Sequence, residues 1–327
     1  MLKLGFAGFR HGHIFSLYEA AKTNENVEIV AAWEEYEEAK EGAKKNYSVN
    51  FTHQSYEDML TDDNIDAIAI GNYYGARGQM AIAALKAGKH VISDKPLCTS
   101  LDELKEIEKL SKEKGLSVGL MLDMRDNKNV LAAKEIIESG RIGEVYNIQF
   151  GGQHPLNYGV RPGWYFEKGK HGGVINDIAI HGIDLISYIT GLEIKNIVAA
   201  RTWNAYATEE PEFKDCGQFM LELSNGGGVI ADISYASPNS MGLNLPYYWE
   251  FKVWGSKGMM LFAANIDGVK LYVNGSLELE NVPGICPKDD YLDGFVNEIN
   301  GKPTRYGTKT AIHSTEMTLS IQQKANL

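Results

Sequence analysis

Short apolar runs alternate with segments of helical periodicity over the first part of this 327-residue chain. The runs expected to form strands are residues 2–9, 27–33, 65–71, 90–93 and 116–122, and the segments expected to form helices are residues 14–22, 36–46, 79–87 and 101–114. The run at 65–71 is apolar enough for a parallel strand that is covered on both faces. Strands and helices in this order predict an α/β fold with a doubly wound parallel sheet.

A second pattern follows an expected helix at residues 129–138. Polar and apolar residues alternate with a period of two in residues 218–223, 229–235 and 249–253, and glycine-containing turns lie at 225–227 and 255–258. Such segments predict a large open, mostly antiparallel sheet whose two faces differ in polarity. The change of pattern predicts two domains, residues 1–123 and residues 124–327.

The composition argues against several classes of protein. The formal net charge is −11 and no run of lysine and arginine offsets it, so binding to a nucleic-acid backbone is not expected. No uncharged stretch approaches the ~20 apolar residues of a membrane-spanning helix, and the first residues do not resemble a secretory signal. The three cysteines, at positions 98, 216 and 286, lack the spacing of a metal site. We therefore expect a soluble cytoplasmic protein with no membrane or nucleic-acid partner.

A glycine-containing segment, Gly8-Phe9-Arg10-His11-Gly12-His13, lies between the first expected strand and the first expected helix. Dinucleotide fingerprints occupy this place, because glycines let the backbone approach a pyrophosphate at the N-terminus of the helix. The match is incomplete, since Arg10 and His13 stand where the second and third fingerprint glycines belong. A tight turn without a ligand is the alternative interpretation.

Glu34 ends the second expected strand and favours the dinucleotide interpretation. A carboxylate at this point can accept hydrogen bonds from the adenosine ribose hydroxyls, and it would repel the 2′-phosphate of NADP. A solvated acid at the strand end is the alternative, because three further glutamates follow within four residues. We expect cofactor binding, with NAD favoured over NADP.

Lys95 follows the expected strand at 90–93 and precedes Pro96. The carboxyl ends of the strands are where open α/β sheets bind ligands. Proline would fix the turn that aims the ammonium group. An ordinary surface charge is the alternative interpretation.

Residues 172–184 are expected to form a helix that begins after two glycines. Asp177, His181, Asp184 and Tyr188 recur at helical spacing and form one polar stripe. A solvated face is the usual origin of such a stripe, but His181 lies between isoleucines and one turn from a carboxylate, which is typical of an oriented base. No third ligand is spaced near this pair, so we expect no metal.

A long aromatic loop at residues 152–173 is expected to form part of a binding surface, although an ordered packing loop explains its composition equally well. The candidate substrate-binding residues in and around it are Arg125, His154, Tyr158, Arg161, Trp164 and Asp184. The segment Tyr247-Tyr248-Trp249 is a further candidate for the pocket lining.

The motifs together resemble those of the Gfo/Idh/MocA oxidoreductases, which include glucose-fructose oxidoreductase and inositol dehydrogenases. The resemblance rests on residues 65–70, 80–91, 94–97, 137–145 and 172–184, the last of which is similar to the family's D-x-x-x-H-x-x-D region. Three features differ. Asp94 replaces the usual glutamate, Arg10 and His13 replace fingerprint glycines, and residues 72–74 with Arg77 replace the usual T-P-N…H stretch.

The resemblance implies an NAD-binding Rossmann domain at 1–123. It also implies a substrate-binding and oligomerisation domain at 124–327, whose open sheet packs against another subunit in a homodimer or homotetramer. Lys95 matches the lysine of the family's E-K-P motif, with a cis bond to Pro96, and Asp177 and His181 match its catalytic aspartate and histidine. The residues expected around the cofactor are Gly8, Phe9, Arg10, His11, Gly12, His13, Glu34, Gly71, Asn72, Tyr73, Asp94, Lys95 and Pro96.

The resulting hypothesis is a dehydrogenase that transfers a hydride between nicotinamide and a hydroxyl or keto carbon of a sugar, polyol or related small molecule. His181 would take the hydroxyl proton, Lys95 would stabilise the developing alkoxide, and Asp177 would orient the imidazole or hold a neighbouring hydroxyl. One alternative is a glycoside-cleaving enzyme that oxidises a sugar transiently. The other is a non-catalytic NAD-binding regulator on the same fold.

Overall fold

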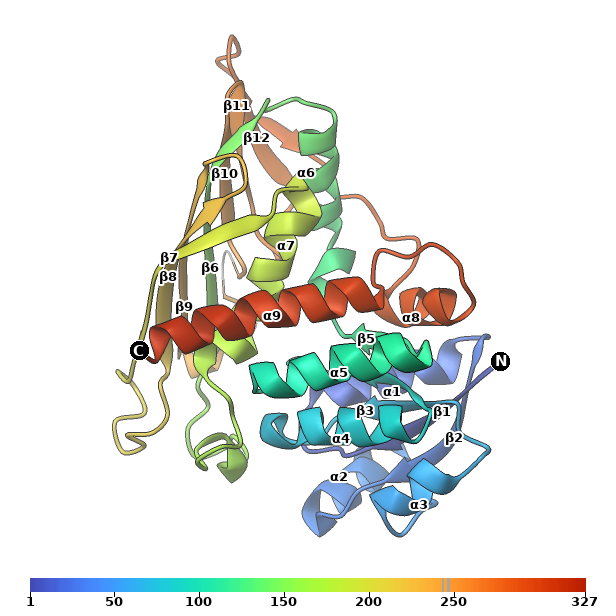
Figure 1. Ribbon diagram of the computed structural model, residues 1–327. Coiled ribbons are helices and arrows are strands. Elements are labelled where there is room, and N and C mark those ends of the chain that lie inside the picture. Colours follow the sequence, from blue (N-terminus) through green and yellow to red (C-terminus); the bar gives the residue numbers. More distant parts are fainter. Residues whose placement is uncertain (243, 246–247) are drawn as a thin grey trace. The chain divides into compact units, whose positions relative to one another are not determined.

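The computed structural model describes residues 1–242, 244–245 and 248–327, which form two compact units. The first unit comprises residues 1–121, 169–172 and 290–316, and the second comprises residues 122–168, 173–289 and 317–327. The last helix, α9 (Thr308–Ala325), contributes its first half to one unit and its second half to the other (Figure 1). The compact units are thus discontinuous in sequence, whereas the boundary near residue 123 was expected from a change of pattern and stays a prediction.

The first unit contains a parallel five-stranded sheet in the order β2-β1-β3-β4-β5, and helices connect its successive strands along the chain (Figure 1). The elements are β1 (Leu2–Ala7), α1 (His13–Thr23), β2 (Val27–Trp33), α2 (Glu37–Tyr47), α3 (Tyr56–Thr61), β3 (Ala67–Ile70), α4 (Tyr74–Lys86), β4 (His90–Ser93), α5 (Leu101–Lys114) and β5 (Val118–Leu120). The predicted doubly wound parallel sheet is therefore confirmed. The short helix α3, which starts with a capping box at Ser55, was not predicted.

Residues near the C-terminus complete this unit. Gly119 in β5 leaves room for helix α8 (Tyr291–Ile299), because a Cβ atom at this glycine would lie 2.8 Å from the ring of Phe295. The backbone N–H of Val118 donates to the hydroxyl of Thr308 at 2.8 Å. Residues 290–316 thus pack with the parallel sheet, although they lie within the stretch of sequence expected to form the second domain.

The second unit is built on an eight-stranded sheet in the order β13-β12-β11-β10-β6-β9-β8-β7. Its strands are β6 (Val145–Pro155), β7 (Ile194–Trp203), β8 (Cys216–Leu223), β9 (Gly228–Ser237), β10 (Phe251–Gly255), β11 (Gly258–Phe262), β12 (Val269–Val273) and β13 (Glu280–Val282). All neighbouring pairs are antiparallel except β6 and β9, which confirms the predicted mostly antiparallel sheet. The strand expected to include Trp249 begins two residues later, because Trp249 has a left-handed backbone with φ of 54°.

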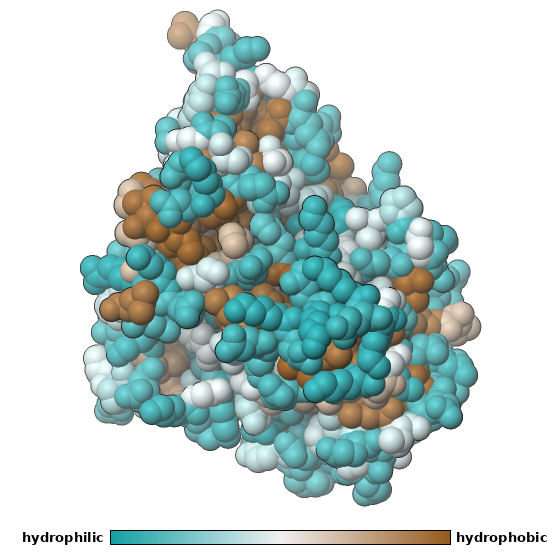
Figure 2. Space-filling model, viewed as in Figure 1, coloured by the Kyte–Doolittle hydropathy of each residue, from teal (hydrophilic) through white to brown (hydrophobic). Residues whose placement is uncertain are grey.

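The two faces of this sheet differ. Helices α6 (Lys128–Glu138) and α7 (Ile180–Thr190) lie on one face (Figure 1), where Gly182 permits close approach, since its Cβ would lie 2.2 Å from the ring of Phe150. The other face carries exposed apolar side chains such as Met220 and Ile230, which lie directly opposite each other in β8 and β9. Figure 2 shows apolar side chains gathered over strands of this sheet.

None of the helices in the described part of the chain combines the length and the apolar character needed to span a bilayer.

Candidate functional site

The loops after β1 and β3 meet at the carboxyl edge of the parallel sheet. The backbone N–H groups of Arg10 and His11 both donate to the carbonyl oxygen of Gly71, at 3.1 and 3.2 Å. Gly8 has φ of 86°, and a Cβ atom there would lie 2.8 Å from the backbone nitrogen of Asn72. Glycine is therefore required at Gly8 by both conformation and space.

The N-terminus of α1 has the properties of an anion site. Its N-cap is Gly12, which offers no side chain to the first N–H groups, and no acidic residue lies in the first turn. A Cβ atom at Gly12 would meet nothing within 4 Å, so the protein itself leaves space there. N–H groups without a side-chain cap and the positive end of a helix favour a phosphate, so these residues fit the pyrophosphate of a dinucleotide.

Glu34 is buried beside this loop. Its two oxygens accept hydrogen bonds from the backbone N–H groups of Phe9, at 2.5 Å, and Tyr36, at 2.8 Å. Burial raises the pKa of Glu34, while these hydrogen bonds and Arg10 act in the opposite direction. Each carboxylate oxygen can accept a second bond, so Glu34 retains the capacity to accept a ribose hydroxyl. The guanidinium of Arg10 stacks on the ring of Tyr36 at 4.0 Å.

Lys95 lies at the carboxyl end of β4 and is only 3 % exposed. The Lys95-Pro96 peptide bond is cis, as the family resemblance implied. Asp94, immediately before it, is fully buried, forms an ion pair with Arg77 and contacts the imidazole of His11. Burial alone would raise the pKa of Asp94, but Arg77 and His11 lower it well below its usual range.

His11 is neutral at physiological pH, because burial lowers its pKa to about 4 despite the nearby Asp94 carboxylate. Its Nδ1 contacts Asp94, and its Nε2 lies 3.0 Å from the hydroxyl of Tyr74. Among the described residues, His11, His13 and Asp94 bring potential metal ligands within 4.8 Å of one another. The guanidinium of Arg77, 2.8 Å from the same carboxylate, would repel a cation, so we interpret this cluster as a hydrogen-bonded network.

The region of the predicted catalytic aspartate is a π-helix, Ile175–Ala179, that precedes α7. The side chain of Gln322 in α9 accepts hydrogen bonds from the backbone N–H groups of Ile175, at 3.0 Å, and Asn176, at 3.3 Å. Gly173 has φ of 103°, and a Cβ atom there would lie 2.2 Å from the Gln322 side chain. π-Helical turns are frequent at functional sites, and this one changes the angular spacing of Asp177 and His181 from that of a regular α-helix.

Asp177 is buried and accepts a hydrogen bond from the hydroxyl of Tyr235 in β9. Burial and the neighbouring carboxylate raise the pKa of Tyr235 well above its usual range, so the phenol keeps its proton. The guanidinium of Arg161 lies 5.1 Å from the ring of Tyr235 and 4.4 Å from that of Tyr165. The two roles expected for Asp177, to orient the imidazole or to hold a neighbouring hydroxyl, stay predictions.

His181 is 5 % exposed and lies in the first turn of α7. Its Nδ1 is 3.6 Å from a carboxylate oxygen of Asp123, and its ring lies edge-on to Trp249 with 5.8 Å between centroids. His154 also lies edge-on to this tryptophan, with 5.9 Å between centroids, and its Nε2 is 3.0 Å from the hydroxyl of Tyr248. His181 and His154 are therefore brought to one aromatic cluster.

The other predicted substrate residues do not all join this cluster. Arg125 and Asp184 form a buried two-point ion pair, with both contacts at 2.7 Å, and Arg125 stacks on Tyr188. Tyr158 is exposed and its hydroxyl donates to Glu210 at 3.1 Å. The remaining positions are a buried Trp164, stacked on Tyr165 at 4.1 Å, and Tyr247, which lies outside the described residues.

Sequence reasoning missed several partners of the site. Asp123, Tyr235 and Gln322 belong to segments far from the D-x-x-x-H-x-x-D region, so no local spacing identifies them. The period-two pattern of residues 229–235 places Tyr235 on the apolar face of its strand, and this pattern predicts that Tyr235 is buried. Arg77 was noted only as a departure from the family pattern, and its contact with Asp94 links it to a second departure.

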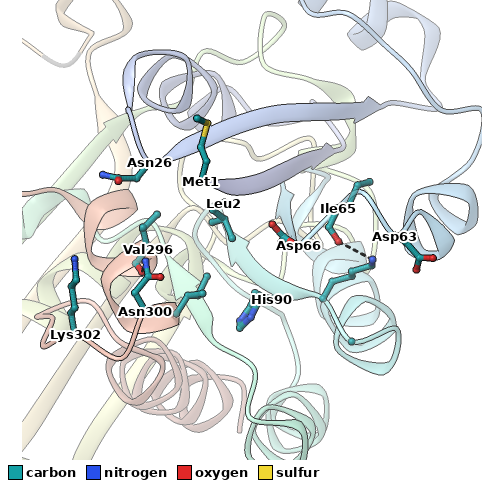
Figure 3. A pocket seen from close by; sticks show the side chains of 13 residues that line it. Met1, Leu2, Asn26, Asp63, Ile65, Asp66, His90, Val296, Asn300 and Lys302 are labelled. Atoms are coloured by element: carbon teal, nitrogen blue, oxygen red, sulfur yellow. Dashed lines mark hydrogen bonds between the residues drawn. The ribbon is translucent and has the colours of Figure 1, made fainter.

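A cavity of about 870 Å³ lies at the opposite, amino edge of the parallel sheet (Figure 3). Residues at the beginnings of strands line it, among them Leu2 and His90, together with Val296 and Asn300 of the C-terminal segment. None of the predicted site residues is among those that line it. This cavity is therefore separate from the dinucleotide loop.

Comparisons with known proteins agree with this description. Residues 2–121 match the family model described as an oxidoreductase family with an NAD-binding Rossmann fold, and residues 130–261 match the model of the Gfo/Idh/MocA C-terminal domain. A levoglucosan dehydrogenase of Pseudarthrobacter phenanthrenivorans is 31% identical over 244 residues, which cover 67% of this chain and 61% of the relative. A myo-inositol 2-dehydrogenase of Thermotoga maritima is 25% identical over 231 residues, which cover 68% of this chain and 64% of the relative.

A crystal structure of an NAD-binding protein from Listeria innocua has the same fold, with a TM-score of 0.82 and 20% identity over 99% of this chain and 95% of that one. The chain matches about three fifths of the length of the curated relatives with which it aligns. The two family models together cover most of the described residues in both units. The chain therefore belongs to the Gfo/Idh/MocA family of oxidoreductases, and residues 2–121 are its NAD-binding Rossmann domain.

Proposed function

We propose that this protein is an NAD-dependent dehydrogenase that acts on a CH–OH group of a sugar, polyol or related small molecule. The observation that carries the proposal is Lys95, a buried lysine at the carboxyl end of β4 within a domain of an NAD-binding oxidoreductase family. A buried ammonium group is costly and suits a site where negative charge develops during a reaction. Relatives named as levoglucosan and myo-inositol dehydrogenases support the class of substrate.

Four side chains of the protein would take part in this reaction. NAD supplies the hydride acceptor when it is bound. His181 accepts the proton of the substrate hydroxyl at an imidazole nitrogen, and Asp123 stabilises the imidazolium that results, since it lies within ion-pair distance of Nδ1. Lys95 stabilises the negative charge on the substrate oxygen. Asp177 accepts the hydrogen bond of the Tyr235 hydroxyl and so holds that side chain in place.

The direct test is the formation of NADH when the purified protein is incubated with NAD and a panel of sugars, inositols and anhydrosugars. The proposal expects one group of related hydroxyl compounds to give NADH. Release of aglycone from a glycoside without net NADH would instead support the transient-oxidation alternative. Tight binding of NAD with no turnover on any compound, including glycosides, would support the regulator and contradict the dehydrogenase.

Cofactor choice is expected to depend on Glu34. Replacing Glu34 by alanine should weaken NAD binding by roughly 10-fold, because a hydrogen bond to a charged group contributes about 1.5–3 kcal/mol. NADP binding should improve, since repulsion of the 2′-phosphate is removed and Arg10 remains nearby. Calorimetric titration of both cofactors measures this, with the exposed Glu28→Ala in the same strand as control. Wild-type protein that binds NADP more tightly than NAD would contradict the assignment.

We also propose that the exposed face of the eight-stranded sheet forms a contact with a second copy of the chain, in a homodimer or homotetramer. Met220 and Ile230 are about half exposed on this face, and they line a hollow of about 480 Å³ together with other residues of β6, β8, β9 and β10. Ile230→Glu should then shift the protein toward monomer in sedimentation velocity, because a charge would be buried without a partner. Leu277→Glu, at an exposed position in the turn after β12, is the matched control. A wild-type monomer would refute the contact.

A further inference from the structure

The turn that carries Lys95 is held by a buried guanidinium. Arg77 in α4 is completely inaccessible to solvent. Its Nη1 donates to the carbonyl oxygens of Asp94, at 2.9 Å, and Pro96, at 3.1 Å, and its Nε donates to that of Asn72 at 2.8 Å. The two carbonyl groups of residues 94 and 96 flank Lys95, so one planar group fixes the backbone on both sides of it.

The Asp94 side chain also binds the Arg77 guanidinium. Its Oδ2 accepts from Nη2 of Arg77 at 2.8 Å and contacts Nδ1 of His11, whose other nitrogen is held by Tyr74. Replacing a buried ion pair by apolar residues is often neutral or stabilising, so the pair is weak evidence for a contribution to stability alone. Positioning is the contribution that the geometry supports, because a guanidinium is a rigid fork with five donors in fixed directions.

We propose that Arg77 and Asp94 act as a clamp that positions the Lys95 ammonium group, and that Arg77 is thereby a positioning residue for the reaction. The inference rests on the proposed role of Lys95. It also explains why two departures from the family pattern occur in one chain, since Arg77 and Asp94 contact each other directly. Displacement of a reacting group by about 1 Å can cost 10²-fold in rate, so a clamp of this kind has a measurable effect.

The first test is a double-mutant cycle between the clamp and the lysine. Arg77→Lys keeps the charge but loses the fork, and it should reduce kcat by roughly 10-fold or more while KM changes by less than about 3-fold. In a Lys95→Ala background the same substitution should have no further effect on kcat, because the group that the clamp positions is gone. Equal fold-losses in the two backgrounds would show that Arg77 does not act through Lys95.

Lys89→Met is the matched control for general damage to this unit. Lys89 is also a buried lysine, and its ammonium donates to the carbonyl oxygens of Asp62 and Ile65 at 2.8 Å each, but it directly precedes β4 and lines the cavity at the amino edge of the sheet. The proposal expects kcat to be unchanged in this variant. A loss of kcat as large as that of Arg77→Lys would overturn the clamp.

Hydrogen exchange tests the clamp without any activity measurement and so separates its failure from failure of the proposed function. Arg77→Lys should accelerate exchange of amides in residues 93–98, and Lys89→Met should not. Unchanged exchange in Arg77→Lys would overturn the proposal even if a substrate is found. Stoichiometric binding of Zn²⁺ to the wild-type protein, abolished in His13→Ala, would also overturn it, because Asp94 would then be a metal ligand.

Discussion

Replacing Lys95 by alanine, or His181 by asparagine, is expected to reduce turnover by roughly 10²-fold or more, the usual effect of removing a charge-stabilising or general-base group. The affinity for NAD should change far less, because the pyrophosphate and the adenosine ribose are assigned to α1 and Glu34. Both residues are buried, at 3 % and 5 % exposure, so solvent screens their electrostatic interactions with the substrate only weakly. Steady-state kinetics and calorimetric titration of NAD measure the two effects separately.

The control for both variants is Lys105→Ala, which removes a solvent-exposed lysine of α5 in the same unit as Lys95. It should retain full turnover. If either Lys95→Ala or His181→Asn retains near-full turnover on the true substrate, the catalytic roles assigned to these residues are wrong.

Breaking the ion pair between Arg125 and Asp184 is expected to destabilise the protein by about 3–5 kcal/mol, the usual cost of leaving one member of a buried pair without its partner. Both contacts of the pair are 2.7 Å long, and its side chains are 8 % and 2 % exposed. Arg125→Met should therefore show the loss in urea-induced unfolding. The double variant Arg125→Met/Asp184→Leu should recover most of it, because no buried charge is left unpaired.

If Arg125→Met lowers the free energy of unfolding by less than about 1 kcal/mol, the effect is in the range measured for exposed ion pairs. Such a result would mean that the pair is not buried as described. Lys195→Met, which removes the surface pair with Glu222, provides that reference in the same sheet-containing unit. Arg125 and Asp184 were predicted as substrate residues. Retained turnover in the double variant would assign them a structural role only.

The parallel sheet was predictable because each of its strands is short, apolar and followed by a helix. Strands β2 and β4 and helix α5 have the bounds that the pattern predicted. Helix α4 begins at Tyr74, five residues before the prediction, because its first turn has no apolar periodicity and contains the buried Arg77. Sequence order did not reveal that the C-terminal segment 290–316 packs against β5, because the backbone N–H of Val118 and its partner Thr308 are 190 residues apart.

The candidate site was predictable as far as its motifs are local. The place of Lys95 at a strand end, the turn at Gly8 and the place of Glu34 after the second strand follow from residues close in sequence, whereas the cis bond to Pro96 was implied by the family resemblance. The partners of the Asp177 region were not predictable, because Tyr235 contacts Asp177 from 58 residues away and Gln322 contacts the π-helix from 146 and 147 residues away. Asp184 was expected to face a substrate, yet its described contacts are with Arg125.

The central claim is that Lys95 and His181 serve one reaction. A crystal structure of the complex with NAD and a substrate identified by the NADH panel tests it most directly. The account predicts that both side chains reach the same substrate oxygen, within ~3–3.5 Å, with nicotinamide forming the floor of the cleft. The claim would be contradicted if the two side chains faced away from each other, or if they lay more than about 10 Å apart with no cofactor-sized gap between them. The limit of about 10 Å is the span of one substrate and its hydrogen bonds.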